Sequence, residues 1–268
     1  MEVKSELKIA LVQQEIAWEN LPANLEYFED VISKISPDTD LVVLPEMFAT
    51  GFSMKPEKFE EESLQASVSA MKSWSATKSM AICGSLMVKE NGSYFNRFYW
   101  FEPNGNSSFY NKAHLFRMGE EQLHYAKGEE QVLIHYKGWK IAPFICYDLR
   151  FPVWIRRTTH FEYDLLIFVA NWPERRTKHW KALTLARAIE NQAFLVAVNR
   201  IGEDGNGVNH SGDSVVISPL GDLILDAGAA AGVFPVNIEY SELKKYREAF
   251  PVGLDTDNFE IKSSCNEK

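Results

Sequence analysis

The sequence predicts an α/β protein in which two layers of strands lie between layers of helices. Three observations support this class. Predicted strands outnumber predicted helices, both halves of the chain combine strand–helix units with antiparallel hairpins, and the two helices in each half could cover one face of a sheet. Two sheets packed face to face, with helices outside them, bury all of these apolar surfaces.

The elements of the first half follow from its apolar periodicity. Apolar side chains recur at helical spacing over residues 20–35 and 64–77, which predicts two helices, and a turn at 37–40 ends the first. Asn91-Gly92 is a strong hairpin signal before an aromatic strand at 94–101. Short apolar runs predict further buried strands at 7–13, 41–44 and 80–89.

The second half repeats this mixture. A very apolar run at 164–170 predicts a buried strand, and a helix over 178–193 leads into another strand at 194–199. A last short helix is predicted over 241–248. The remaining predicted strands span 132–135, 139–145, 213–218 and 223–226.

Composition sets limits on the class of protein. The 268 residues suffice for one large domain, which we place at 1–255, followed by a polar tail at 256–268. The net charge is −9 and there is no dense stripe of Lys and Arg, so nucleic acid is not an expected partner. The longest apolar runs are strand-sized, so no membrane span is expected.

The cysteine content indicates a reducing environment. There are only three cysteines, Cys83, Cys146 and Cys265, and this small, odd number does not suit a disulfide framework. It fits a cytoplasmic protein. The N-terminus also lacks the apolar core of a signal peptide. Cys83 lies in an apolar strand and is predicted to be core, whereas Cys265 lies in the polar tail and is predicted to be exposed.

Residues 140–154 contain the most informative motif. An apolar run leads to Cys146, and a polar turn and an amphipathic stretch follow, which predicts a buried strand, a sharp corner and a helix. A thiol at such a corner can be exposed near backbone N–H groups that hold an oxyanion. Taken alone, the motif favours a simpler interpretation, in which Cys146 is a small buried side chain of the core. The rest of the chain reverses that preference.

Two charged residues also stand at the ends of predicted strands. Glu46 follows the run 41–44 and Pro45, so it is either a partly buried general base or a solvated loop acid. Lys112 lies among aromatic and apolar neighbours, where a buried ammonium would need a nearby anion and could stabilise an oxyanion. A solvated charge is the alternative for this lysine.

Glu46, Lys112 and Cys146, in this order and context, resemble the nitrilase superfamily of carbon–nitrogen hydrolases, whose members use a Glu–Lys–Cys triad. The resemblance covers nearly the whole chain. The matching blocks are Leu44-Pro-Glu-Met-Phe48, Asn111-Lys-Ala-His-Leu-Phe116, Ile145-Cys-Tyr-Asp-Leu-Arg-Phe-Pro152, Ala186-Arg-Ala-Ile-Glu-Asn-Gln192, Gly212-Asp-Ser214 and Pro219-Leu-Gly221. Residues 112–125 and 170–173 resemble the bacterial omega-amidase branch, which hydrolyses the terminal amide of 2-oxoglutaramate and 2-oxosuccinamate.

The resemblance implies a four-layer α-β-β-α sandwich of the nitrilase type that acts on a small-molecule amide. It also implies that the enzyme needs no cofactor or metal and forms a homodimer or a higher homo-oligomer. Many superfamily members have a second glutamate in the loop after the lysine. Alignment of this loop gives Glu121, and the adjacent Glu120 is the alternative because spacing does not separate the two.

The chemistry expected of these residues is acyl transfer through a thioester. Cys146 attacks the amide carbon as a thiolate while Glu46 takes the thiol proton and passes it to the leaving nitrogen. Lys112 and a backbone N–H, that of Tyr147, hold the tetrahedral oxyanion. Glu121 keeps Lys112 and Glu46 in register or positions the substrate amide.

The remaining pocket residues are predicted from the substrate. A 2-oxo acid has a carboxylate that requires a cation, and Arg176 is the first candidate, with Arg117 and His210 as further candidates. Trp172 is expected to form an apolar wall, or to be plain core. Two histidines either support the site or are purely structural, namely His114 and His179.

Several alternatives stay open. A nitrilase or an N-carbamoyl hydrolase would use the same triad, and a catalytically dead relative would bind a ligand without turnover. A redox-sensor role for Cys146 would need a resolving cysteine nearby in sequence, and there is none. No Cys/His cluster has the spacing of metal ligands, and no glycine-rich phosphate loop follows the cysteine.

Overall fold

The computed structural model describes residues 3–257 and 259–261, and it contains two six-stranded sheets packed face to face. Cys265 and the end of the expected tail lie outside the described residues. The first sheet has the order β14-β1-β2-β3-β4-β5. Its strands are β1 (Glu6–Gln13), β2 (Leu41–Val43), β3 (Ala81–Glu90), β4 (Ser93–Phe101), β5 (Ser107–Asn111) and β14 (Gly232–Glu239).

The second sheet has the order β13-β12-β9-β8-β7-β6. Its strands are β6 (Ile134–Tyr136), β7 (Trp139–Ile145), β8 (Leu165–Ala170), β9 (Phe194–Asn199), β12 (Val215–Ile217) and β13 (Leu223–Asp226). A separate two-stranded hairpin follows β9 and consists of β10 (Ile201–Glu203) and β11 (Asn209–Ser211). This hairpin was not expected from the sequence.

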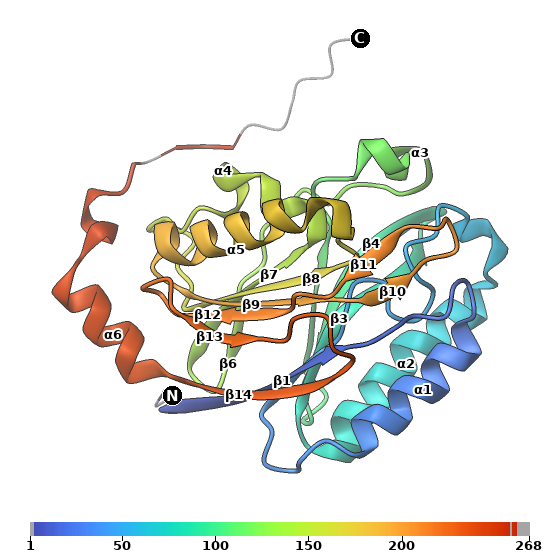
Figure 1. Ribbon diagram of the computed structural model, residues 1–268, viewed down its shortest axis with the longest axis horizontal. Helices are drawn as coiled ribbons and strands as arrows, with labels where there is room; N and C mark the ends of the chain where they lie inside the picture. The colour runs from blue at the N-terminus through green and yellow to red at the C-terminus, as the bar shows by residue number, and fades with distance from the viewer. Residues whose placement is uncertain (1–2, 258, 262–268) are drawn as a thin grey trace, which may run out of the picture.

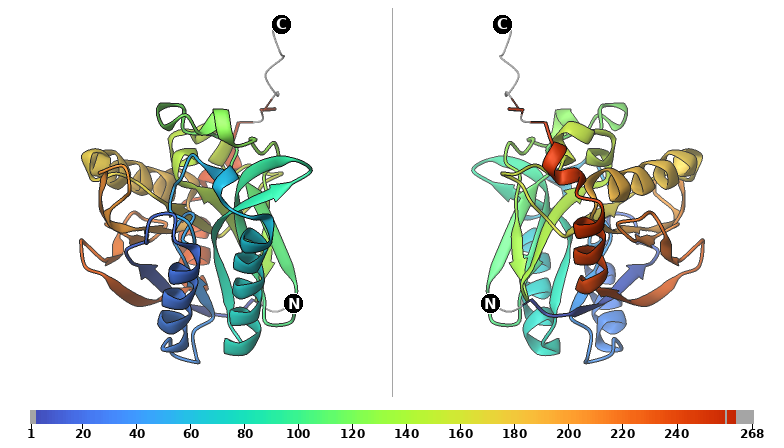
Figure 2. Two further views of the ribbon diagram at one scale, coloured as in Figure 1. Left: turned by 90° about the vertical axis from the view of Figure 1, so that its right-hand side faces the viewer. Right: turned by 90° about the vertical axis from the view of Figure 1, so that its left-hand side faces the viewer.

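Helices cover the outer faces of the sandwich, as Figure 1 shows. On the first sheet, α1 (Leu21–Ser33) and α2 (Glu61–Lys78) lie side by side (Figure 2), and α5 (Thr177–Asn191) covers the second sheet. The α-β-β-α order agrees with the predicted fold. The last helix, α6 (Tyr240–Ala249), agrees with the helix predicted over 241–248, and its Arg247 donates hydrogen bonds to Asp164, Tyr163 and Gln192.

Strand periodicity explains the sandwich. In β1, Leu7, Ile9 and Leu11 belong to the core between the sheets, whereas Ala10 and Val12 belong to the core beneath α1 and α2. Both faces are therefore apolar, as is typical of a strand covered on both sides. Cys83 in β3 is fully buried between the sheets, which confirms that it is a core residue. Its pKa is raised by burial, so this thiol stays protonated.

Four strands end at the same edge of the sandwich and carry the candidate residues. β2 and β5 run in the same direction in the first sheet, and β7 and β8 are parallel neighbours in the second. The strand and corner predicted around Cys146 are present, but the chain continues as a 3₁₀ turn, η3 (Cys146–Arg150), and the short helix α4 (Pro152–Ile155). Pro152 suits the first turn of α4, because proline has no backbone N–H and the first N–H groups of a helix have no hydrogen-bond partner within it.

Candidate active site

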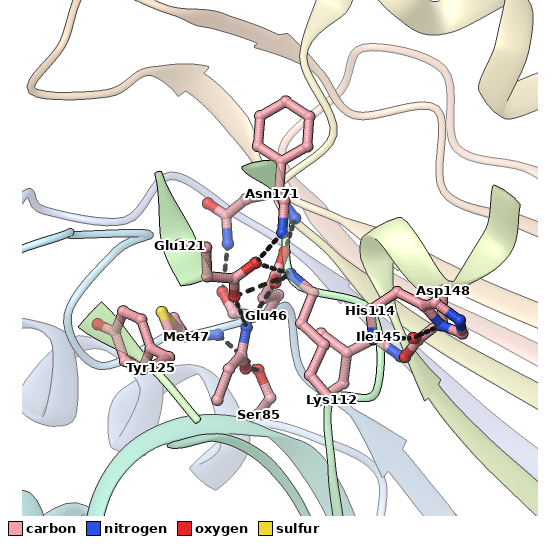
Figure 3. Close-up of polar contacts among 12 residues, drawn as sticks. Glu46, Met47, Ser85, Lys112, His114, Glu121, Tyr125, Ile145, Asp148 and Asn171 are labelled. Carbon is pink, nitrogen blue, oxygen red and sulfur yellow. Dashed lines mark hydrogen bonds and ion pairs between the residues drawn. The ribbon is translucent and has the colours of Figure 1, made fainter. Parts of the chain in front are cut away.

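Lys112 lies between two carboxylates at the edge of the first sheet (Figure 3). It follows β5, and its Nζ donates to Glu46 Oε1 over 2.8 Å and lies 3.0 Å from Glu121 Oε2. Glu46 follows β2, and Glu121 begins the short helix α3 (Glu121–His124). The three side chains have no exposed surface. The structure thus brings together three of the residues that the sequence singled out.

The charges of this cluster depend on one another. Burial alone would lower the pKa of Lys112, but the neighbouring Glu121 and Glu46 carboxylates outweigh it and raise that pKa. Burial raises the pKa of Glu121, with Lys112 opposing this and Glu46 adding to it. Lys112 therefore remains an ammonium, which compensates the negative charge that would otherwise be isolated in the protein interior.

The two adjacent glutamates differ in position. Glu121 is fully buried, and its Oε2 accepts a 2.6 Å hydrogen bond from the backbone N–H of Phe116. Glu120 is exposed, and its backbone is left-handed with φ of 59° between two helical turns. Sequence spacing could not separate them because the local turn determines which of the two side chains points inward.

Asn96 supports both carboxylates and was not anticipated. Its Nδ2 donates to Glu46 Oε1 over 2.7 Å and to Glu121 Oε1 over 3.2 Å, and its Oδ1 accepts from Ser85 Oγ over 2.9 Å. Ser85 Oγ in turn accepts the backbone N–H of Met47. The available sequence signal was a polar residue within the aromatic strand β4. The network leaves the Glu46 side chain with fixed donors on both sides.

Cys146 reaches the site from the second sheet. It follows β7 with a left-handed backbone, φ of 44°, which turns the chain sharply at the thiol. Burial raises the pKa of this thiol, Glu46 raises it further, and Lys112 lowers it. The net direction is upward, so Cys146 rests as a neutral thiol and its ionisation requires a base.

Asn171 connects the end of β8 to Glu46. Its backbone N–H donates to Glu46 Oε2 over 2.7 Å, and its side-chain Nδ2 donates to the Glu46 carbonyl. The same backbone amide also lowers the pKa of Cys146, so it is close to both groups. This contact was not predicted, because the residues lie far apart in the chain.

A cavity of about 250 Å³ opens onto these groups. Lys112 and Cys146 line it, as do three residues predicted from the sequence to bind substrate, namely Tyr147, Trp172 and Arg176. The Trp172 ring is almost fully buried, and its Nε1 donates to the carbonyl of Arg176. The fold therefore places the predicted apolar wall and the first candidate cation in the same cavity.

The other candidate cations are placed differently. Arg117 is exposed and lines a neighbouring groove. His210 lines the cavity, but burial and the charge of Arg200 lower its pKa to about 4, so it is neutral at pH 7. Two arginines that were not predicted, Arg150 and Arg175, also line the cavity.

The two remaining histidines contact residues beside the cavity. His114 stacks on Phe151, and its Nδ1 lies 2.8 Å from Asp148 Oδ1. His179 Nδ1 lies 3.2 Å from Arg150 Nη2. Neither histidine is among the residues that line the cavity.

Within residues 3–257 and 259–261, no three or more His, Cys, Asp and Glu side chains are grouped so that they could hold a metal ion. In the same ranges, no helix is long and apolar enough to cross a membrane.

Comparison with known proteins identifies the family. The sequence profile of the carbon–nitrogen hydrolases matches residues 8–248. This chain belongs to the carbon–nitrogen hydrolase family. It is thus a hydrolase of carbon–nitrogen bonds. The position of the thiol and the ammonium at one cavity, with two buried carboxylates bound to the ammonium, agrees with that activity.

Individual relatives of this carbon–nitrogen hydrolase align over almost their whole length. Omega-amidase YafV of Escherichia coli (strain K12) is 43% identical over 95% of this chain and 98% of its own. The 2-oxoglutaramate amidase of Bacillus subtilis (strain 168) is 33% identical over 91% and 95%. Among solved structures, XC1258 of Xanthomonas campestris, a CN-hydrolase superfamily protein, is 39% identical with a TM-score of 0.93, covering 97% of this chain and 100% of that one.

Proposed function

We propose that this hydrolase is an omega-amidase that converts a small 2-oxo acid amide, such as 2-oxoglutaramate or 2-oxosuccinamate, into the 2-oxo dicarboxylate and ammonia. The observation that carries the proposal is a single cavity with a thiol and a buried ammonium at its base and arginines on its wall. Relatives named omega-amidase and 2-oxoglutaramate amidase support the choice of substrate.

The proposed reaction begins with proton transfer from Cys146 to Glu46. The neutral resting thiol requires this base, and the thiolate then attacks the amide carbon to give a tetrahedral oxyanion. Glu46 returns the proton to the amide nitrogen, the carbon–nitrogen bond breaks, and ammonia leaves a thioester on Cys146. Water, deprotonated by Glu46, attacks the thioester carbonyl and releases the acid and the thiol.

Lys112 is the proposed electrostatic partner of the oxyanion, together with the backbone N–H of Tyr147. Tyr147 is the second residue of η3, and the first amides of a helical turn have no partner within that turn. Glu121 holds the Lys112 ammonium in place through its 3.0 Å contact and so acts as the second glutamate of the site.

Arg176 is proposed to bind the substrate carboxylate. Across the described residues, no ion pair joins Arg150, Arg175 or Arg176 to an acidic side chain. Although the protein has a net charge of −9, these three positive charges are therefore available to bind a substrate carboxylate. The one acidic side chain on the cavity wall, Asp204, accepts hydrogen bonds from its own hairpin. The Trp172 ring is proposed to pack against the carbon chain of the substrate.

Another small amide, a nitrile or an N-carbamoyl substrate is the alternative within the same chemistry. A ligand-binding relative without activity is the alternative outside it. The test is ammonia release from 2-oxoglutaramate, a neutral amide of similar length, a nitrile and a carbamoyl amino acid. We expect the highest kcat/KM for 2-oxoglutaramate. A preference for the neutral amide or the nitrile would contradict the omega-amidase assignment, and release from none of them would favour the inactive relative.

We infer in addition that the protein is cytoplasmic and forms a homodimer or a higher homo-oligomer, with one domain at residues 1–255 and a tail at 256–268. A free catalytic thiol suits a reducing compartment. Exposed apolar side chains on α5 and around β13 are suited to a contact between copies, namely Leu185, Ile189, Leu220, Leu223 and Ile224. Light scattering after size-exclusion chromatography tests this, and a mass of one chain would contradict it.

A further inference from the structure

Asp148 is a buried carboxylate next to the site that the proposed mechanism does not use. It has no exposed surface, and each of its oxygens accepts two hydrogen bonds. Oδ2 accepts from the backbone N–H of Ile145 at 3.0 Å and from the Tyr110 hydroxyl at 2.8 Å. Oδ1 accepts from the backbone N–H of His114 at 3.0 Å and contacts its Nδ1 at 2.8 Å.

These partners come from both sheets. Ile145 ends β7 of the second sheet and immediately precedes Cys146. Tyr110 and His114 flank Lys112, two residues away on either side, at the end of β5 in the first sheet. One carboxylate therefore joins the segment that carries the lysine to the segment that carries the thiol. Figure 3 shows Asp148 between His114 and Ile145, beside the Lys112 cluster.

The turn at Cys146 needs such support. Its φ of 44° places a non-glycine residue in the left-handed region, which persists only where the surroundings hold it. The hydrogen bond from Ile145 N–H to Asp148 closes the turn around the cysteine on one side. On the other side, Tyr110 also accepts from the Trp154 Nε1, which extends the same network into α4.

We propose that Asp148 is a positioning residue that sets the distance between the Cys146 thiol and the Lys112 ammonium. It does not line the cavity and so acts through these two neighbours rather than on the substrate. The inference rests on the proposed function, in which the thiol attacks and the ammonium holds the oxyanion. A displacement of about 1 Å between reacting groups can lower a rate on the order of 10²-fold.

Asp148 must present an acceptor oxygen on both sides, not only the right shape. Each carboxylate oxygen accepts one backbone N–H, from Ile145 on one side and His114 on the other. A backbone amide only donates, so an asparagine side chain at this position would point its NH₂ group at a backbone donor in either orientation. Asp148→Asn therefore breaks one of the two links although it preserves the volume.

The matched control is Asp40, another buried aspartate that joins the two sheets, at the opposite edge. It accepts from the Lys8 N–H at 2.9 Å, from Lys4 Nζ at 2.6 Å and from Lys137 Nζ. Asp40→Asn therefore weakens a cross-sheet link of a buried aspartate without touching the site. Tyr110→Phe is the milder companion of Asp148→Asn, since Asp148 loses one donor and keeps both of its backbone hydrogen bonds. The variant also removes the acceptor of the Ala113 N–H and the Trp154 Nε1.

The experiment measures three quantities on the purified full-length protein: kcat and KM for the best amide of the panel, the thermal midpoint, and the iodoacetamide alkylation rate of Cys146 followed by peptide mass spectrometry. For Asp148→Asn we expect kcat to fall on the order of 10²-fold, KM to change only a few-fold, and alkylation to slow because the thiolate loses its ammonium neighbour. Tyr110→Phe should show a smaller loss of kcat. Asp40→Asn should lower the thermal midpoint and leave kcat and alkylation near those of the wild type.

Two results would overturn the inference. One is a kcat for Asp148→Asn close to wild type. The other is a result in which Asp40→Asn and Asp148→Asn lose the same amount of thermal midpoint and the same amount of kcat. That result would mean that any cross-sheet link affects activity only through stability. If Asp148→Asn does not fold, an unchanged kcat and alkylation rate in Tyr110→Phe would refute it. Alkylation needs no substrate, so a wrong substrate assignment leaves this readout intact and the two failures remain distinct.

Discussion

The two edges of the sandwich are both fastened by a buried aspartate, but the partners differ. At the edge opposite the cavity, Asp40 binds one backbone amide, that of Lys8, and the ammonium groups of Lys4 and Lys137, whose side chains are 39% and 38% exposed. At the cavity edge, Asp148 binds two backbone amides, a phenol and an imidazole. The first set can move with its flexible lysines, whereas the second fixes the backbone on either side of Lys112 and Cys146.

This difference separates stability from geometry. Partly exposed lysine–aspartate pairs contribute modestly to folding and tolerate small displacements. Backbone amides held by one carboxylate tolerate very little, because their positions also define the turn at Cys146. We therefore expect substitutions at the cavity edge to change activity, and substitutions at the opposite edge to change stability alone. The following predictions test that division, from the largest expected effect to the smallest.

Cys146→Ala should abolish turnover while the protein stays folded. The change removes the proposed nucleophile and little volume, and loss of a nucleophile typically lowers kcat on the order of 10⁴–10⁶-fold. Ammonia release measured on the purified variant checks this. Activity within tenfold of wild type would refute a covalent mechanism at this thiol. Cys146→Ser should also be nearly inactive, because Glu46 is not expected to activate a hydroxyl well.

Glu46→Gln should separate turnover from thiol reactivity. Loss of a general base lowers the rate on the order of 10²–10⁴-fold. The Glu46 charge raises the pKa of Cys146, whereas Lys112 lowers it. A neutral glutamine removes the first effect and keeps the second, so the pKa of Cys146 should fall. The thiolate is the alkylated form, and the alkylation profile should thus move to lower pH. A shift to higher pH would show that Glu46 does not act on the thiol electrostatically.

Lys112→Met should lose both activity and stability. Removal of an oxyanion donor typically lowers kcat on the order of 10²–10³-fold, with a smaller change in substrate affinity. The substitution also leaves Glu46 and Glu121 buried without a cation, which costs about 3–5 kcal/mol of unfolding free energy. Adding Glu121→Gln should restore part of the stability and none of the activity. A single variant within a few-fold of wild-type kcat would make Lys112 a structural charge.

Arg176→Leu should weaken recognition of the substrate carboxylate. We expect a higher KM for 2-oxoglutaramate, by an amount worth about 1.5–3 kcal/mol, the usual range for a charged hydrogen bond. A neutral amide of similar length should be affected much less, and it is the internal control. An equal response of both substrates would assign a structural role to Arg176 and move the recognition to another cation, with Arg150 and Arg175 next in line.

Asp40→Asn should leave turnover unchanged and lower stability by about 1 kcal/mol at neutral pH. Burial alone would raise the pKa of Asp40, but hydrogen bonds from Lys137 and Lys4 lower it below its ordinary value. A depressed pKa stabilises the fold above the pKa of the unfolded chain, and this contribution is lost as the pH falls through the lower folded value. The difference in thermal midpoint should therefore shrink below about pH 4. A difference that grows in acid would contradict this sign.

Local patterns predicted the framework of the site well. Glu46 and Cys146 each follow an apolar run, and such a run identifies a strand and its end without knowledge of its partners. Lys112 follows only the aromatic pair Phe109-Tyr110. The same reasoning placed β1 to β4, α1, α2 and α5 close to their observed bounds. It did not predict β14, in which exposed side chains interrupt the apolar pattern. This strand forms because it pairs with β1, more than two hundred positions earlier in the chain.

The sequence by itself determined which residue types end each strand and in what order, since these depend on neighbours along the chain. Tertiary structure decided which of them meet. Asn96, Lys112 and Asn171 contact Glu46 from 50, 66 and 125 positions away, and no local period encodes such separations. It also buried Glu121 rather than Glu120 and placed Asp148 beside the site, because burial, rather than residue type, determines which carboxylate must be fully hydrogen-bonded.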